Sequence, residues 1–529
     1  MLDIEATAAG LVDLFGAGQS VALLTTTNSA AASSVPELDI PFALDEAGPR
    51  RHNTSLERLA TQQWRIAMST RLCNRHGVPI ASPMVEEFAA GLAGKMIQPA
   101  DPDYDTARQI WNAAIDRHPG LIVRCLGVAD VIQAVRFARA NDLLVAVRGG
   151  GHNVAGRALC DDGIVIDLSA MRGVLVDART RTVQVQGGAM LGDLDRETHL
   201  HGLAVPTGVV SKTGVAGLTL GGGVGWLVRK HGLSCDNVIS FEVVTAAGDL
   251  VSASAEENSD LFWALRGGGG NFGIVTCFRF RAQPISMVLG GLIAHPRERA
   301  GEMLRFYRDF MATAPEELTA YAAMVTTPDG MPAVAMIGCW CGDMAEGERV
   351  LAPLRAYGPP ALDAIQPMPF PAMQGLLNMA FPDRSHNYWK ASFVPKLTDE
   401  VIDLLVEHGN RMQSALSGVV VEFYGGAPGR VSASESAFTQ RQAEYNIGIT
   451  AQWSNPAESA KHIAWARAMY EALEPYSNGN HFLNFQSEAG DDVIRRSFGK
   501  NYDRLAEVKR KYDPTNFFSL NQNIKAAAA

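Results

Sequence analysis

Three glycine clusters constrain this chain more than any other feature of its sequence. They read RGGGHN at 148–153, SKTGVAGLTLGGGVGW at 211–226 and RGGGGNFG at 266–273. Glycine has no Cβ, so the backbone at such clusters can approach a ligand closely. Successive N–H groups in these turns form concave sites for anions such as pyrophosphate. One triplet alone would indicate a tight turn, but three clusters predict a large phosphate-bearing cofactor.

The two common nucleotide-binding loops are absent from the sequence. A Rossmann fingerprint needs G-x-G-x-x-G and an acidic residue about 20 positions later. Trp226 stands where the third glycine after Gly221 and Gly223 would fall. A P-loop needs G-x-x-x-x-G-K-S/T, and no segment has that pattern. The cofactor must therefore be held by another kind of fold.

Length, charge and cysteine content exclude several classes of protein. The 529 residues exceed the about 100–200 of one domain, which predicts two or three domains. The net charge of −10 argues against a nucleic-acid-binding protein. No apolar run of membrane-spanning length and no basic leader is present, so we expect no membrane span and no export signal. The odd count of 7 cysteines, with Cys339 and Cys341 lacking a second ligand pair, favours a cytoplasmic protein without a metal site.

The first 95 residues differ from the rest of the chain. LLTTTNSAAASSVPE has a composition typical of mobile segments, while LERLATQQWRIAMSTRL and MVEEFAAGLAGKM predict helices. Two interpretations stay open. Residues 1–95 form an extension of unknown role that is partly disordered or helical, or the chain begins at an early start codon and Met84 is the working start.

From about residue 105 the pattern is typical of α+β structure. Residues 105–284 predict strands in PGLIVRCL, GIVIDLS and TVQVQGGA, a helix in VIQAVRFARAND capped by Asp130, and a hairpin in NVISFEVVTAAGDLVSAS. Residues 285–475 predict a second mixture, with helices in RERAGEMLRFYRDFM and AESAKHIAWARAMYEAL and strands in GVVVEFYGG and YNIGITAQW. Residues 476–529 form a tail.

His152 directly follows the first glycine triplet, Gly149 to Gly151. A neutral imidazole is a competent nucleophile. A glycine loop would place this ring beside the cofactor, where it could bond to the activated methyl group of a flavin.

With YDPTNFFSLNQNI at 512–524, these clusters resemble the FAD-binding domain of the p-cresol methylhydroxylase and vanillyl-alcohol oxidase superfamily. The tail is similar to that of the berberine-bridge-enzyme-like branch, and the similarity spans about residues 95–529. The resemblance implies an α+β fold. It has a two-subdomain FAD-binding domain of the p-cresol methylhydroxylase type (105–284), an α+β substrate-binding domain with an antiparallel sheet (285–475), and a C-terminal segment (476–529) that returns to the FAD domain.

The resemblance also implies FAD bound through a single covalent link from His152 to the flavin 8α-methyl group. The residues that it places around FAD are Arg148, Gly149, Gly150, Gly151, His152, Asn153, Gly208, Ser211, Thr213, Gly214, Gly217, Thr219, Gly221, Gly222, Gly225, Asn271, Gly273, Val275, Asn484, Asn521 and Asn523. Two positions depart from the family pattern. Val210 stands where many members have a second, cysteine tether, and Gly448 stands where many have a catalytic base.

By resemblance, the activity would be transfer of a hydride from an alcohol or amine carbon of a small organic substrate to FAD, and then to O2, giving H2O2. Gly208, at the position given to an oxygen gatekeeper, favours an oxidase. With the family base missing, the candidate bases are Tyr445, Glu422, Tyr424 and Tyr388, and strand alternation puts Glu422 and Tyr424 on one face. Lys390 would either pair with a substrate anion or lie on the surface.

Two alternatives remain: a dehydrogenase that uses another acceptor, and a non-catalytic flavin-binding protein. The substrate also stays open among sugars, alkaloids, polyketides and other intermediates of bacterial secondary metabolism.

Overall fold

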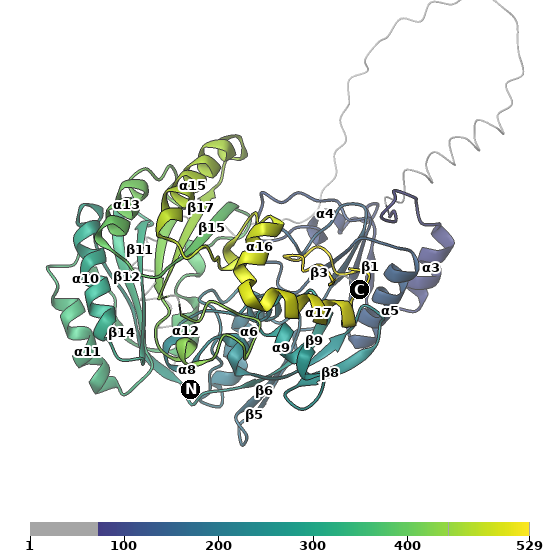
Figure 1. Ribbon diagram of the computed structural model, residues 1–529, viewed down its shortest axis with the longest axis horizontal. Helices are drawn as coiled ribbons and strands as arrows, with labels where there is room; N and C mark the ends of the chain where they lie inside the picture. Colours follow the sequence, from purple (N-terminus) through teal and green to yellow (C-terminus); the bar gives the residue numbers. More distant parts are fainter. Residues whose placement is uncertain (1–71, 443, 528–529) are drawn as a thin grey trace, which may run out of the picture. The chain divides into compact units, whose positions relative to one another are not determined.

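The computed structural model describes residues 72–442 and 444–527 (Figure 1), which fall within one structural unit, Ser69–Ala529. The segments LLTTTNSAAASSVPE and LERLATQQWRIAMSTRL lie outside the described residues. Within the described part of the chain, no helix is long and apolar enough to cross a membrane.

A small, mostly parallel sheet forms the first subdomain. Its strands, in spatial order, are β1 (Lys95–Ile97), β2 (Leu121–Arg124), β4 (Ile164–Asp167) and β3 (Val145–Arg148), and only the β1–β2 pair is antiparallel. The valines and isoleucines of β2 and β4 are buried, as is typical of parallel strands. Helix α5 (Val128–Ala140) packs on this sheet. It begins at Val128 after Gly127, so the cap predicted at Asp130 is wrong; the Asp130 carboxylate instead accepts bonds from the N–H groups of Ala93 and Leu126.

The folded region begins before residue 95. Helix α3 (Ser82–Ala90) lies at the start of the predicted MVEEFAAGLAGKM helix. Leu72 and Ile80 are buried with Val85 and Phe88 in the core of the first subdomain. The boundary predicted at 95 therefore falls inside a packed unit, and a chain starting at Met84 would lack Leu72 and Ile80 in that core.

A five-stranded antiparallel sheet forms the second subdomain. Its order is β5 (Val174–Asp177), β6 (Thr182–Gln186), β9 (Ile274–Arg281), β7 (Val238–Val244) and β8 (Leu250–Ser254). The predicted hairpin is confirmed as β7 and β8, with Gly248 at φ +80° in the turn. The core of this subdomain also includes side chains of α6 (Leu191–His199), α7 (Val215–Leu220), α9 (Ser259–Leu265), α16 (Asp491–Phe498) and α17 (Tyr502–Tyr512).

The predicted antiparallel sheet of the substrate-binding domain is confirmed as eight strands. Along the sheet run β13 (Leu362–Asp363), β10 (Met287–Pro296), β12 (Pro332–Trp340), β11 (Leu318–Thr326), β16 (Gly418–Phe423), β17 (Tyr445–Trp453) and β15 (His386–Val394), and β14 (Gln366–Pro369) pairs with β10. One face is covered by α10 (Ala300–Thr313), α11 (Met344–Ala356), α13 (Asp399–Gly409) and α15 (Ser459–Leu473), as Figure 1 shows. Shorter helices are α4 (Tyr104–Ala107), α8 (Val228–His231), α12 (Phe370–Gly375) and α14 (Ala427–Arg430).

Both faces of this large sheet are buried, and its strands alternate between them. On β17, Ile447 and Ile449 pack under the helices, whereas Gly448 and Thr450 face the other way. This second face, called the inner face below, is turned toward the glycine clusters.

The C-terminal segment returns to the FAD-binding part, as the resemblance implies. The side chain of Asn521 donates to the carbonyl of Gly270, at 2.9 Å, and Asn271 donates to the carbonyl of Gln522, at 3.1 Å. A fully buried ion pair, Lys509 with Asp513 at 2.6 Å, holds the turn that leads into this return. The tail thus closes one side of the third glycine cluster.

Candidate active site

A cavity of about 320 Å³ lies between the glycine clusters and the inner face of the large sheet. Most of the residues expected to hold FAD line it. They are Gly149, Gly150, Gly151, His152, Asn153, Gly208, Thr213, Gly214, Gly217, Gly221, Gly273, Val275, Asn484 and Asn521. Residues as far apart in sequence as Gly149 and Asn521 therefore meet around one space, although no single loop encloses it.

The other residues predicted to touch FAD do not line the cavity. They are Arg148, Ser211, Thr219, Gly222, Gly225, Asn271 and Asn523. Arg148 is buried and donates to Asp167 at 2.6 Å, and Asn271 donates to the carbonyl of Gly268 at 2.9 Å. Ser211 donates to the side-chain oxygen of Asn378 at 2.9 Å. At least these three hold the lining loops in place.

Glycine is required where the first two clusters meet. A Cβ on Gly150 would lie 2.5 Å from the Cα of Gly214, and a Cβ on Gly214 would lie 2.5 Å from the backbone nitrogen of Gly150. Gly217 differs, because a Cβ there would meet nothing within 4 Å. The loops therefore pack backbone to backbone and leave open space above α7, which suits a bulky, flat cofactor with phosphates.

His152 lines the cavity from the first glycine cluster. Its Nε2 atom is buried and has no hydrogen-bond partner among the residues that the structure describes. Burial lowers the pKa of His152 to about 4, so the imidazole is neutral near pH 7. The indole of Trp111 stacks on it. A neutral, oriented and unpartnered imidazole has the properties of a nucleophile.

Glu422 is the single carboxyl among the described residues that line the cavity. Its Oε2 atom accepts hydrogen bonds from the Tyr424 hydroxyl and from the Asn446 amide, each at 2.7 Å. Burial raises the pKa of Glu422 above its ordinary range, although both hydrogen bonds oppose the shift. The prediction that Glu422 and Tyr424 share a face is confirmed. Tyr424 does not line the cavity and acts on it only through Glu422.

Tyr445 and Tyr388 lie on the helix-covered face of the sheet, so neither can serve as the base in this cavity. Tyr445 packs in the core against the ring of Phe423, with centroids 5.1 Å apart. The Tyr388 hydroxyl donates to Glu488 at 2.9 Å and accepts from Arg467 at 3.0 Å. Both predictions depended on strand position, and strand alternation carries these side chains away from the flavin site.

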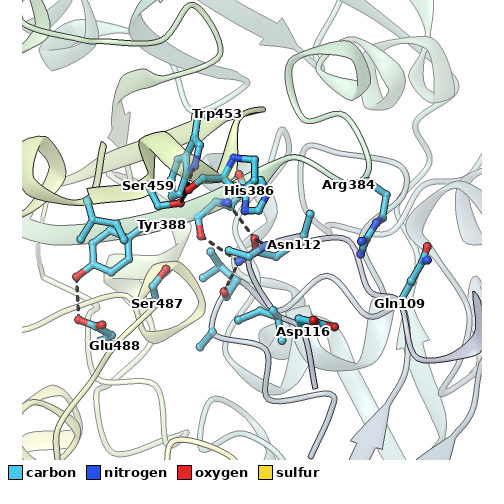
Figure 2. A pocket seen from close by; sticks show the side chains of 18 of the residues that line it. Gln109, Asn112, Asp116, Arg384, His386, Tyr388, Trp453, Ser459, Ser487 and Glu488 are labelled. Atoms are coloured by element: carbon cyan, nitrogen blue, oxygen red, sulfur yellow. Dashed lines mark hydrogen bonds between the residues drawn. The ribbon is translucent and has the colours of Figure 1, made fainter. Parts of the chain in front are cut away.

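Tyr388 instead lines a second hollow, of about 650 Å³, shown in Figure 2. In that view Tyr388 points toward Glu488, and Asn112 lies at the centre among hydrogen-bonded neighbours. The nearby Lys390 is buried, and its Nζ donates to the backbone carbonyl of Glu488 at 2.9 Å. The predicted surface role for Lys390 is therefore wrong, and Lys390 does not line the flavin cavity.

Gly208 does not leave an open path as expected. It lines the cavity, but a Cβ there would lie 2.5 Å from Cδ1 of Leu218 and 3.1 Å from Cδ1 of Leu191. Leucine side chains already fill that direction, so the absence of a side chain at 208 carries no argument about oxygen. Val210 and Gly448 both line the cavity, so neither a cysteine nor a base is present at these two positions.

Several lining side chains were missed from the sequence. They are Arg157, Leu218, Tyr321, Ile337, Phe381, Trp389, Val420 and Thr450. The Tyr321 hydroxyl is buried without a partner in the described residues, and Tyr321 pairs in register with Glu422 on the next strand. The alternating strand LTAYAAMVT could have indicated that Tyr321 shares a face with Ala323 and Val325. The strand YNIGITAQW, with Ile447 and Ile449 on one face and Gly448 and Thr450 on the other, could have indicated the more polar face but not that it meets the cofactor.

Comparison with known proteins places this arrangement in a class. Residues 119–254 match the family model described as FAD binding domain, and residues 481–525 match the model described as berberine and berberine like. The fold and the site thus define a flavin-dependent oxidoreductase.

The chain aligns with nearly the whole length of its known relatives. (R)-6-hydroxynicotine oxidase of Paenarthrobacter nicotinovorans is 32% identical, over 82% of this chain and 97% of its own. An FAD-linked oxidoreductase of Dictyostelium discoideum is 30% identical, over 84% of this chain and 97% of its own. A crystal structure of 6-hydroxy-D-nicotine oxidase from Arthrobacter nicotinovorans superposes with a TM-score of 0.76 at 31% identity, covering 84% and 99% of the two chains. The chain belongs to the berberine-bridge-enzyme-like family of FAD-linked oxidoreductases.

Proposed function

We propose that the protein is an oxidase that removes a hydride from an alcohol or amine carbon of a small organic substrate and passes the electrons to O2, giving H2O2. The observation that carries this proposal is the position of Glu422. Its carboxyl lies in the same cavity as the glycine clusters and His152, on the opposite wall. A base on one wall and a hydride acceptor on the other are what such a reaction needs.

FAD fits the residues present. Gly149 to Gly151 offer backbone to the phosphates, Gly217 leaves room for a flat ring, and the unpartnered Nε2 of His152 faces a buried space. When bound, FAD supplies a ring that accepts a hydride and later returns two electrons to an acceptor. We propose that His152 holds it through one covalent bond, with no second bond at Val210.

Glu422 takes the substrate proton in this proposal. Tyr424 and Asn446 hold one carboxyl oxygen and leave the other to the cavity. A well-placed base contributes typically about 10²–10⁴-fold to the rate. The proton passes from the substrate to the carboxylate in the cavity that Glu422 lines.

The test is made on the purified holoenzyme. Acid precipitation should leave the yellow colour with the protein, and intact mass should exceed that of the chain by one FAD. Alcohols and amines are then screened anaerobically for bleaching of the flavin, followed by admission of air with peroxide detection. Bleaching, reoxidation and stoichiometric peroxide are expected.

Other outcomes separate the alternatives. A flavin that is bleached by substrate but is not reoxidised by air would replace the oxidase with a dehydrogenase. A flavin that no substrate reduces would favour a binding protein. Pigment that leaves the protein on unfolding would remove only the covalent bond.

A further inference from the structure

Glu422 is a buried carboxyl without a cation beside it in the described part of the chain. Its partners are two neutral donors, Tyr424 and Asn446. The fully buried carboxylates of Asp167 and Asp513 are different, because each contacts a cation within 2.6 Å. A buried charge is stable only when it is paired. The ionised form of Glu422 therefore lacks the cationic partner that Asp167 and Asp513 have, and unlike the equally unpaired, buried Asp195 it lines a cavity that a ligand can enter.

The cations near this cavity have other partners. Arg157, which lines it, donates from Nη1 to the backbone carbonyl of Leu520 in the C-terminal segment; its Nε atom has no partner among the described residues, and it forms no ion pair with Glu422. Lys390 points to the opposite face of the sheet, where it donates to the carbonyl of Glu488. The remaining lining side chain that can become cationic is His152, and burial keeps it neutral. Any cation that pairs with Glu422 must come from outside the described chain.

Polar groups surround Glu422 on the inner face, and Thr450 is a further polar side chain that lines the cavity from this face. Tyr321 and Asn446 are its register partners on the two neighbouring strands. The Tyr321 hydroxyl and the Asn446 Oδ1 atom are both buried, and neither has a partner among the residues described. The rest of this wall consists mainly of apolar side chains: Ala323, Val325, Ile337, Phe381, Trp389 and Val420. The cavity thus has one small polar end and an apolar body.

We propose that the substrate is an apolar amine whose ammonium group pairs with Glu422 and whose hydrocarbon body lies against Val420, Ile337 and Trp389. This inference rests on the proposed function, which it narrows from alcohols and amines to amines. The unpartnered hydroxyl of Tyr321, which lines the cavity, accepts a further N–H group. Sugars would bury many hydroxyls without partners, and a substrate carboxylate would meet the carboxyl of Glu422.

The reaction balances with these groups. Glu422 accepts one proton from the ammonium, which gives a neutral amine. The carbon next to nitrogen then loses a hydride to the flavin as a C=N bond forms, so the amine is oxidised to an iminium. Water converts the iminium to a carbonyl compound and a released amine. Dioxygen takes the two electrons and two protons and becomes H2O2.

Binding probes test the charge preference on the holoenzyme without requiring turnover. The holoenzyme is titrated with benzyltrimethylammonium, benzyl alcohol and benzoate, and the change in flavin absorbance gives the Kd of each. The phenethyl and naphthylmethyl members of each series are then measured in the same way. We expect the cation of at least one series to bind 10-fold or more tightly than its alcohol and its carboxylate. Glu422→Gln should abolish that preference. We expect the Kd of the cation to rise 10-fold while the Kd of the alcohol changes less than threefold.

Glu488→Gln is the matched control, because this carboxylate lines the second hollow and not the flavin cavity; it should keep the preference. The inference is overturned if alcohol or carboxylate binds as tightly as the cation in every series. It is also overturned if Glu422→Gln keeps the cation affinity or if no cation binds. Oxidation of alcohols with peroxide release in any of these cases would leave the proposed function standing.

Discussion

The indole ring of Trp111 lies nearly parallel to the imidazole of His152, with ring centroids 4.1 Å apart and an angle of 14° between the planes. Trp111 is held on two sides. Its indole N–H donates to the carbonyl of Phe381, and its backbone N–H donates to the carbonyl of Gly151. Asn112, the next residue, donates from its side chain to the carbonyls of Val154 and Asn387. The domain that carries the large sheet thereby helps to orient the residue proposed to tether the cofactor.

Replacing Trp111 by alanine should therefore impair formation of the flavin bond. Aromatic pairs contribute about 0.5–1.5 kcal/mol beyond buried area, so the orientation of His152 should loosen several-fold. We expect a smaller fraction of flavin to stay with acid-precipitated protein, measured by absorbance and by intact mass. Trp111→Phe, which keeps a flat ring, should retain most of the bond. Full flavin retention in Trp111→Ala would show that the stacking has no part in the linkage.

Glu422 should set the acidic limb of the pH profile. Burial raises its pKa, so the carboxyl keeps its proton to higher pH than an exposed glutamate, and kcat/KM should fall as pH drops through that raised value. Tyr321 and Tyr424 have pKa values raised well above 10 by burial, so they stay protonated there. Glu422→Gln should lower kcat/KM by about 10²–10⁴-fold and remove the limb.

Tyr424→Phe provides a finer test of the same carboxyl. The Tyr424 hydroxyl bonds to the Glu422 carboxylate and lowers its pKa, so removing that bond should move the acidic limb to higher pH. The measurement is the pH dependence of kcat/KM in both variants. If the acidic limb lies at the same pH in Tyr424→Phe and is still present in Glu422→Gln, then it reports the titration of a group other than Glu422.

The buried pair Lys509–Asp513 should be needed for stability and for the closed tail. Lys509 also donates to the carbonyls of Asn271 and Phe518, which ties α17 to the third glycine cluster. Removing one partner of a buried pair costs about 3–5 kcal/mol, so Lys509→Met should lower the free energy of unfolding by that amount. Lys511→Ala breaks the exposed pair with Asp260 and should change it by less than about 1 kcal/mol. Equal denaturation midpoints for the two variants would contradict this assignment.

Alanine substitutions at Gly150 and Gly217 should affect different properties: the first should lower thermal stability, and the second should reduce flavin binding. Gly150→Ala places a Cβ 2.5 Å from the backbone of Gly214, and such overpacking costs about 1–3 kcal/mol, so thermal unfolding should occur at lower temperature. Gly217→Ala meets nothing within 4 Å and should leave the stability of the flavin-free chain unchanged while reducing flavin binding. Both effects are measured by calorimetry and by flavin content. An unchanged flavin content in Gly217→Ala would mean that this open space does not receive the cofactor.

Much of the site could be predicted locally. The glycine clusters, His152 after the first of them, and the shared face of Glu422 and Tyr424 depend on a few neighbouring residues and on strand alternation. The structure brings fourteen of the expected residues to one cavity, although the clusters are far apart in sequence. Arg148 and Asn271 were predicted in the right loops but in the wrong role, because a sequence motif does not separate a lining residue from one that supports it.

The sequence by itself determined that glycine turns, a nucleophilic imidazole and an alternating strand are present, since these follow from covalent structure and local geometry. Only the tertiary structure decided which face of the large sheet meets the cofactor. Both faces are buried. β17 alternates between apolar residues under the helices and the polar Asn446, Thr450 and Gln452 on the inner face, but this pattern does not show what the polar face meets. Packing under α10, α13 and α15 therefore carried Tyr445 and Tyr388 away from the cavity and left Glu422 inside it.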